Sequence, residues 1–155
     1  LFTVTIPIKA QAMKEIKYSV KREYDLKGLR LLLVEDEVGI AESCNELLTA
    51  KGCRVTSVSS TRDAMQAVQT DQFDIVIMDL KMPGEITGIQ FYEWMLSYMP
   101  VIKEKVILMT GDTLSPEYRT FIEKSKVPVI TKPFRFNIFL ERIGITAKKA
   151  GLIQV

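Results

Sequence analysis

Five short apolar runs, each of strand length, alternate along most of this chain with stretches that have helical periodicity. The runs are rich in Val, Ile and Leu, which is typical of parallel strands buried on both faces. They cover residues 29–34, 54–58, 74–78, 106–110 and 127–131. Strands that alternate with helices in this way predict an α/β fold with one doubly wound, five-stranded parallel sheet.

Apolar side chains between these runs recur at helical spacing and mark five helices. A stripe from Ile40 to Leu48 gives the first helix, which Gly52 closes, and Ser60 to Asp63 resembles a capping box at the start of the second. The other three helices are expected around residues 89–99, from Ser115 and Pro116 onward, and over residues 135–143. Right-handed crossovers then give a flavodoxin-like fold with three α/β/α layers.

The pattern divides the chain into three parts. Residues 1–26 stand outside the repeating pattern, and we interpret them as the end of a preceding domain followed by a linker. Residues 27–144 form the predicted α/β domain, and residues 145–155 are expected to be a C-terminal tail. The chain begins at Leu1 without a visible targeting peptide, so we expect it to be a piece of a longer protein.

The composition excludes several classes of function. The chain has no histidine, which removes Ser-His-Asp and Cys-His catalysis, the usual zinc sites and a phosphohistidine of its own. Cys44 and Cys53 form no CxxC pair, which suits a reducing cytoplasm. The net charge is +2 and neither sign forms a long block, so nucleic acid and membrane surfaces are not expected partners.

Polar residues follow the predicted strands at their carboxyl ends, where parallel strands open onto one crevice. Two carboxylates about 4 Å apart repel by roughly 4 kcal/mol at an effective dielectric constant of 20, so Glu35, Asp36 and Asp79 require a cation. An oxygen-only cluster of this kind suits Mg²⁺. Lys132 and Thr110 add an ammonium and a hydroxyl group, which would stabilise a transferring phosphoryl group. Asp79 is then available as the nucleophile.

Four motifs at these strand ends closely resemble the receiver domain of two-component response regulators. They are Leu-Leu-Val-Glu-Asp-Glu at 32–37, Ile-Val-Ile-Met-Asp-Leu-Lys-Met-Pro-Gly at 75–84, Val-Ile-Leu-Met-Thr-Gly at 106–111 and Thr-Lys-Pro-Phe at 131–134. The resemblance extends from residue 28 to about residue 143, and four motifs in the right order are far more specific than any one of them.

The resemblance implies a role for each of the residues at the strand ends. Asp79 would be phosphorylated, with Thr110 and Lys132 in contact with the phosphoryl group, and the Lys132–Pro133 peptide would be cis. Mg²⁺ would be held by Glu35, Asp36, Asp79 and the backbone carbonyl of Lys81. Glu37 is not expected to be a ligand, because an acidic residue in the first turn of a helix is favoured by the helix dipole.

The resemblance also implies the place of the chain in signalling. The domain would accept a phosphoryl group from a phosphohistidine, on a histidine kinase or on a histidine phosphotransfer protein, and would lose it by Mg²⁺-assisted hydrolysis. Residues 1–8 look like the final strand of a sensor histidine kinase ATP-binding domain. The chain would then be the C-terminal receiver of a bacterial hybrid histidine kinase, and the longer protein would be the enzyme.

Three departures from the usual receiver pattern are visible. Glu35 stands where Asp is more frequent, and the loop at residues 84–88 is one residue longer than usual. Val129 occupies the position where many receivers carry a Tyr or Phe that rotates inward on phosphorylation. We therefore expect the response to phosphorylation to be confined largely to the loops around Thr110 and Lys81.

Three other functions remain as alternatives. A receiver-like docking scaffold would keep the fold without phosphotransfer, although the intact set of acidic, Thr and Lys residues argues against this. A Mg²⁺-dependent phosphohydrolase generally has a second acid two residues after its nucleophilic Asp, where this chain has Lys81. A flavodoxin-type flavin protein would need a phosphate loop rich in Ser, Thr and Gly, in place of which residues 35–37 are acidic.

Overall fold

The computed structural model describes residues 23–154 and confirms the predicted parallel sheet. The strands are β1 (Arg30–Val34), β2 (Arg54–Val58), β3 (Ile75–Asp79), β4 (Val106–Thr110) and β5 (Val129–Thr131). They pair in the order β2-β1-β3-β4-β5, and every pairing is parallel. The strand predicted for residues 1–8 lies outside the described residues.

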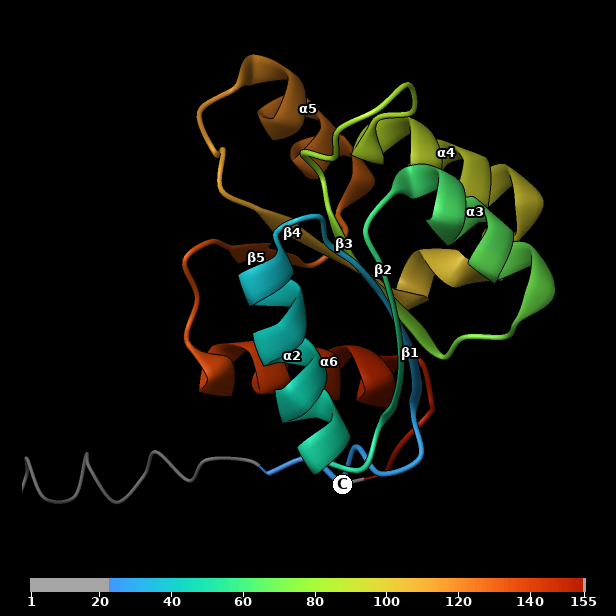
Figure 1. Cartoon of the computed structure of the whole chain (residues 1–155), viewed down its shortest axis with the longest axis vertical. Helices are drawn as coiled ribbons and strands as arrows, with labels where there is room; N and C mark the ends of the chain where they lie inside the picture. Colours follow the sequence, from blue (N-terminus) through green and yellow to red (C-terminus); the bar gives the residue numbers. More distant parts are fainter. Residues whose placement is uncertain (1–22, 155) are drawn as a thin grey trace, which may run out of the picture.

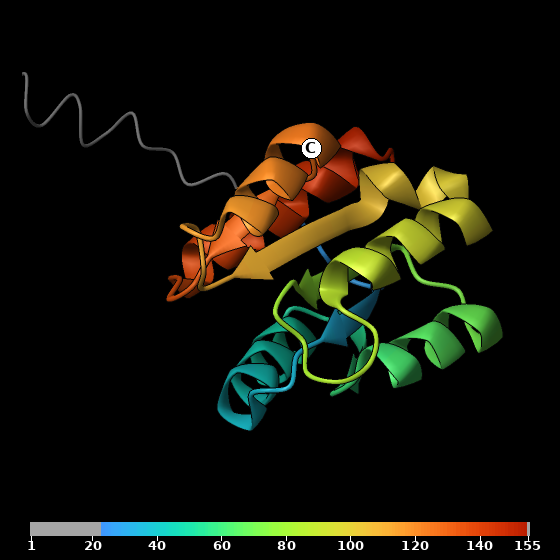
Figure 2. The same ribbon diagram turned by 90° about the horizontal axis from the view of Figure 1, so that it is seen from above.

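Helices cover both faces of the sheet and give the three predicted layers (Figure 1). They are α2 (Val38–Ala50), α3 (Thr61–Thr70), α4 (Gly88–Tyr98), α5 (Pro116–Ser125) and α6 (Phe136–Lys149), with a 3₁₀ helix, η1 (Pro100–Lys105), after α4. Figures 1 and 2 both show α3 and α4 side by side, and the two helices are in contact. No helix among residues 23–154 is long and apolar enough to cross a membrane.

Side chains of the central strands point alternately to the two faces of the sheet, so the hydrophobic core is divided into two halves. Leu31 and Leu33 of β1 pack with buried residues of α2 and α6 on one face of the sheet. Leu32 and Val34 pack on the opposite face with buried residues of α3 and α4. Because β1, β3 and β4 are covered on both faces, they are almost continuously apolar, as the sequence predicts.

The outer strands differ from the prediction that all five strands are buried on both faces. Strand β2 lies at the edge of the sheet, and none of its five residues is fully buried. Strand β5 forms the other edge and contains only three residues, because Val127 and Pro128 precede it rather than belonging to it. Edge strands have one neighbouring strand and fewer helices above them, so their sequences tolerate polar side chains.

The last helix is longer than predicted. Helix α6 was expected over residues 135–143, but it continues to Lys149, into the segment expected to be a tail. Its buried stripe continues from Phe139 and Ile143 to Ala147, and the ring of Tyr24 lies directly against Gly144. Burial of the last two turns explains why the helix does not end at Ile143, since most helical stability in proteins comes from such packing.

An ion pair joins β1 and β3 at the end of the sheet opposite the polar strand ends. The Asp74 carboxylate accepts hydrogen bonds from the backbone N–H of Arg30 at 2.8 Å and from its guanidinium at 3.1 and 3.3 Å. Burial by itself raises the pKa of Asp74, but these bonds lower it more, so the pKa lies below its usual 3.8. The ionised carboxylate therefore stabilises the folded state.

We predict that Asp74→Asn lowers the free energy of unfolding at pH 7 by about 1–2 kcal/mol. The folded-state pKa of Asp74 is depressed, so its contribution is present above pH 3.8 and is lost as the pH falls below that value. Urea unfolding from pH 7 to pH 3 should show the two proteins converging in acid. Asp71→Asn, at an exposed acid, is the control, and a difference that stayed constant over this range would contradict the assignment.

Candidate functional site

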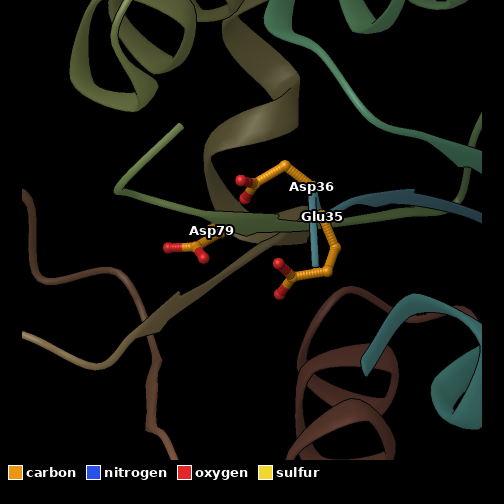
Figure 3. A group of neighbouring side chains, drawn as sticks. All are labelled: Glu35, Asp36 and Asp79. Carbon is orange, nitrogen blue, oxygen red and sulfur yellow. The ribbon is translucent and has the colours of Figure 1, made fainter. Parts of the chain in front are cut away.

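Three carboxylates meet where β1 and β3 end. Glu35 and Asp36 directly follow β1, and Asp79 is the last residue of β3. Because Val34 pairs with Met78 in the sheet, the next residue of each strand reaches the same edge. One oxygen of each carboxylate lies within 4.8 Å of the others, and Figure 3 shows the three groups gathered around a common space. The predicted acidic cluster is therefore present in the fold.

Lys132 brings a buried ammonium group into this cluster. Its Nζ lies 2.6 Å from Asp79 Oδ2 and 2.6 Å from Glu35 Oε2. The backbone N–H of Lys132 donates to the carbonyl of Thr110 at 2.8 Å, which fixes the residue just beyond β5. The Lys132–Pro133 peptide is cis, as the resemblance implies.

Glu37 lies closer to this ammonium group than the sequence suggested. Its Oε1 is 3.4 Å from Lys132 Nζ, while its side chain remains largely exposed. Glu37 stands at the N-cap position of α2, but its side chain makes no capping hydrogen bond. The sequence predicted that Glu37 interacts favourably with the dipole of this helix, but it did not predict the contact with Lys132.

Backbone N–H groups fix the orientation of both buried carboxylates. Asp79 Oδ1 accepts a hydrogen bond from the N–H of Lys81 at 2.9 Å, and Glu35 Oε1 accepts one from the N–H of Glu37 at 3.0 Å. In each case the donor lies two residues after the acceptor, where the chain turns away from its strand. The second oxygen of each carboxylate is left facing Lys132.

Burial and ion pairing shift the pKa values of this group in opposite directions. Burial raises the pKa of Glu35, and the nearby ammonium of Lys132 and the hydrogen bond from the N–H of Glu37 offset only part of that effect. Burial by itself lowers the pKa of Lys132, but Asp79 and Glu35 raise it more, so the ammonium stays charged. When all three carboxylates are ionised, one ammonium leaves two negative charges uncompensated.

The site fits a divalent cation with oxygen ligands. Glu35 Oε2 is buried and makes only the ion-pair contact with Lys132, without a well-aligned hydrogen bond. Asp36 is half-buried, and within residues 23–154 it makes neither an ion pair nor a side-chain hydrogen bond. Carboxylate oxygens with spare acceptor capacity, at the open edge of the sheet, are the donor set that Mg²⁺ prefers.

Thr110 is buried at the end of β4, but its hydroxyl group is engaged outside the carboxylate cluster. It donates a hydrogen bond to the carbonyl of Asp112 at 3.0 Å and accepts one from the N–H of Asp112 at 3.1 Å. The structure therefore brings Thr110 to the correct strand end, but its hydroxyl makes no hydrogen bond to the carboxylate of Asp79 or to the ammonium of Lys132.

Asp112 is a site neighbour that the sequence analysis missed. Its Oδ1 accepts hydrogen bonds from the N–H groups of Leu114 and Ser115, at 3.1 and 2.9 Å, just before α5. These bonds hold the pKa of its carboxyl below the ordinary value. An Asp shortly before a Ser-Pro helix start is a recognisable turn signal, so this role could have been predicted. Asp112 thus connects Thr110 to the start of α5.

Comparison with known proteins identifies the family. Residues 31–144 match the response regulator receiver domain. The transcription factor SKN7 of Saccharomyces cerevisiae is 29% identical over 108 residues, which cover 70% of this chain and 17% of that protein. The sensor histidine kinase GacS of Pseudomonas protegens is 28% identical over 131 residues, which cover 79% of this chain and 14% of that protein.

A solved structure agrees with these matches. The response regulator protein TrrA of Thermotoga maritima, in complex with Mg²⁺ and BeF, superposes with a TM-score of 0.66 and 25% identity. The superposition covers 76% of this chain and 98% of TrrA.

The chain therefore belongs to the response regulator receiver family, whose members are the phosphoacceptors of two-component signalling. It spans under a fifth of the length of the two curated relatives named above.

Proposed function

We propose that Asp79 is the residue of this receiver that accepts the phosphoryl group. The observation that carries the proposal is the position of Asp79 Oδ2, 2.6 Å from the buried Lys132 ammonium and beside two further carboxylates. The N–H of Lys81 holds the other oxygen of Asp79. This leaves an oriented carboxylate oxygen at the edge of the sheet that can act as a nucleophile.

The donor would be a phosphohistidine of a histidine kinase or of a histidine phosphotransfer protein. An Asp79 oxygen forms a bond to phosphorus as the phosphorus–nitrogen bond breaks, and the electron pair leaves with the imidazole. Lys132 then moves its contact from the carboxylate to the phosphoryl oxygens, while the hydroxyl of Thr110 exchanges its Asp112 partner for one of them. Water later hydrolyses the acyl phosphate and regenerates the Asp79 carboxylate.

We propose that Mg²⁺ is held by Asp36, Asp79, Glu35 and the backbone carbonyl of Lys81. When bound, the cation neutralises the carboxylates and the charge of the phosphoryl group. The two uncompensated negative charges of the cluster support a cation at this position. TrrA carries Mg²⁺ in its solved structure, and so does the receiver domain of the sensor histidine kinase PA1611 of Pseudomonas aeruginosa, which has a similar fold.

The origin in a hybrid histidine kinase is a further part of the proposal. The similarity to GacS supports it, as does the position of residues 1–26 before the receiver. In such a protein, residues 27–144 would be the receiver domain and the kinase would act from the cytoplasm. Partner proteins that carry phosphohistidine are then expected, and nucleic acid is not.

Membership of the receiver family favours the phosphoacceptor function over the phosphohydrolase and flavin alternatives. The side chain of Lys81 is exposed where a phosphohydrolase would place a second acid. The docking scaffold remains the alternative to test, since such a protein would keep the fold and fail to take up a phosphoryl group.

We predict that Asp36→Ala weakens Mg²⁺ binding about tenfold or more, because it removes the carboxylate that makes no ion pair to Lys132. Calorimetric titration of the unphosphorylated chain with Mg²⁺ measures this change. Glu46→Ala, which removes an exposed acid of the same charge from α2, is the control and should bind Mg²⁺ as the original chain does. Equal affinities for the original chain and Asp36→Ala would show that the cation site is elsewhere.

We predict that the chain takes up one phosphoryl group from a small acyl phosphate, only when Mg²⁺ is present. Asp79→Asn should take up none, because an amide is not a nucleophile of this kind although it keeps the shape of the carboxylate. Intact-protein mass spectrometry measures the uptake. A phosphorylated Asp79→Asn protein would overturn the assignment of Asp79, and an unlabelled original chain would support the docking scaffold.

A further inference from the structure

The loop that joins β3 to α4, residues 80–87, carries one of the proposed metal ligands, the carbonyl of Lys81. It is drawn in yellow-green in Figure 1. Lys81 is exposed, whereas Met82 is buried and Ile86 is half-buried against the core below α3 and α4. A backbone carbonyl binds a cation well only when its position is fixed in advance, so the supports of this loop bear directly on the site.

Both ends of the loop are fixed by the elements that it joins. At its start, the N–H of Leu80 donates to the carbonyl of Met109 in β4 at 3.0 Å. At its end, Thr87 and Gln90 form a capping box that sets the first turn of α4. The backbone of Gly88 packs closely against the backbone of Leu80, since a Cβ added to Gly88 would lie 2.5 Å from the carbonyl oxygen of Leu80. A further hydrogen bond reaches the loop from α3, at Ile86 just before Thr87.

Thr61, the first residue of α3, makes this hydrogen bond to the C-terminal part of the loop. Its hydroxyl donates a hydrogen bond of 2.8 Å to the carbonyl of Ile86, although the two residues are 25 positions apart. Thr61 is only 3% exposed and Ile86 is half-buried, so the bond is partly shielded from water. The side chain is free for this contact because the neighbouring Ser60 caps α3, with its own hydroxyl accepting from the N–H of Asp63.

A second contact between α3 and the loop contributes little. Arg62 and Glu85 approach to 3.7 Å, but both side chains are more than four-fifths exposed. Exposed ion pairs of this kind stabilise proteins weakly and are screened by salt. The part-buried hydrogen bond of Thr61 is therefore the stronger of the two contacts that hold the loop against α3.

We propose that Thr61 is a positioning residue for the site: through the Ile86 carbonyl it holds the β3–α4 loop, and with it the Lys81 carbonyl, in the conformation that receives Mg²⁺. The inference rests on the proposed function, because it takes the Lys81 carbonyl as a metal ligand. It assigns to α3, which contributes no residue to the acidic cluster, a part in setting the affinity of that cluster for the cation.

The test compares Thr61→Val, which keeps the shape and removes the hydroxyl, with Thr61→Ser, which keeps the hydroxyl. We expect Thr61→Val to bind Mg²⁺ about threefold to tenfold more weakly in a calorimetric titration of the full chain, and Thr61→Ser to restore most of the affinity. Hydrogen exchange without metal should be faster in Thr61→Val at the amides of residues 84–87. Val68→Ala, which removes buried methyl groups from the same helix and leaves a cavity, is the control for a general loss of stability. It should leave Mg²⁺ affinity unchanged.

Each outcome has a separate meaning. If the original chain binds Mg²⁺ and Thr61→Val binds it equally well, the positioning role is wrong while the proposed metal site stands. If Val68→Ala weakens binding as much as Thr61→Val, the effect is one of general stability, and the positioning role is also wrong. If the original chain binds no Mg²⁺, the proposed metal site itself fails.

Discussion

A single buried ammonium group, on Lys132, lies among more carboxylates than it can neutralise, and the chemistry of the site follows from this imbalance. The parallel sheet imposes it, because β1 and β3 are neighbours and both end in acidic residues. Such repulsion costs several kcal/mol when the groups are shielded from water, so a cation is needed to relieve it. The same imbalance supports the proposed binding of a divalent cation, which would also offset the negative charge of an incoming phosphoryl group.

The surrounding loops hold the site in place by hydrogen bonds to backbone groups. The N–H groups of Lys81 and Glu37 orient the two buried carboxylates, and Thr61 holds the β3–α4 loop from the neighbouring helix. On the other side, the hydroxyl of Thr110 is bonded to Asp112, whose carboxylate holds the backbone just before α5. A phosphoryl group that drew Thr110 away would loosen this loop first, which agrees with a response confined to loops in a receiver with Val129 in place of an aromatic residue.

The sequence predicted most of the fold and the acidic cluster for the same reason. Strands buried on both faces must be apolar, and the polar residues that end them must then meet at one edge of the sheet. The short edge strand β5 was predicted two residues too long, because Val127 is buried like a strand residue although Pro128 follows it. The bond between Thr61 and Ile86 could not be predicted, since its acceptor is a backbone carbonyl that any residue would provide.

The most direct test of the account is a crystal structure of the chain with Mg²⁺ and beryllofluoride, a mimic of the phosphoryl group. We expect beryllium to be bonded to an Asp79 oxygen, with Lys132 Nζ and Thr110 Oγ1 in contact with its fluorides. Mg²⁺ should lie about 2.1 Å from oxygens of Glu35, Asp36, Asp79 and the Lys81 carbonyl. A structure in which Asp79 stayed unmodified beside Lys132, or in which the cation bound away from these oxygens, would contradict it.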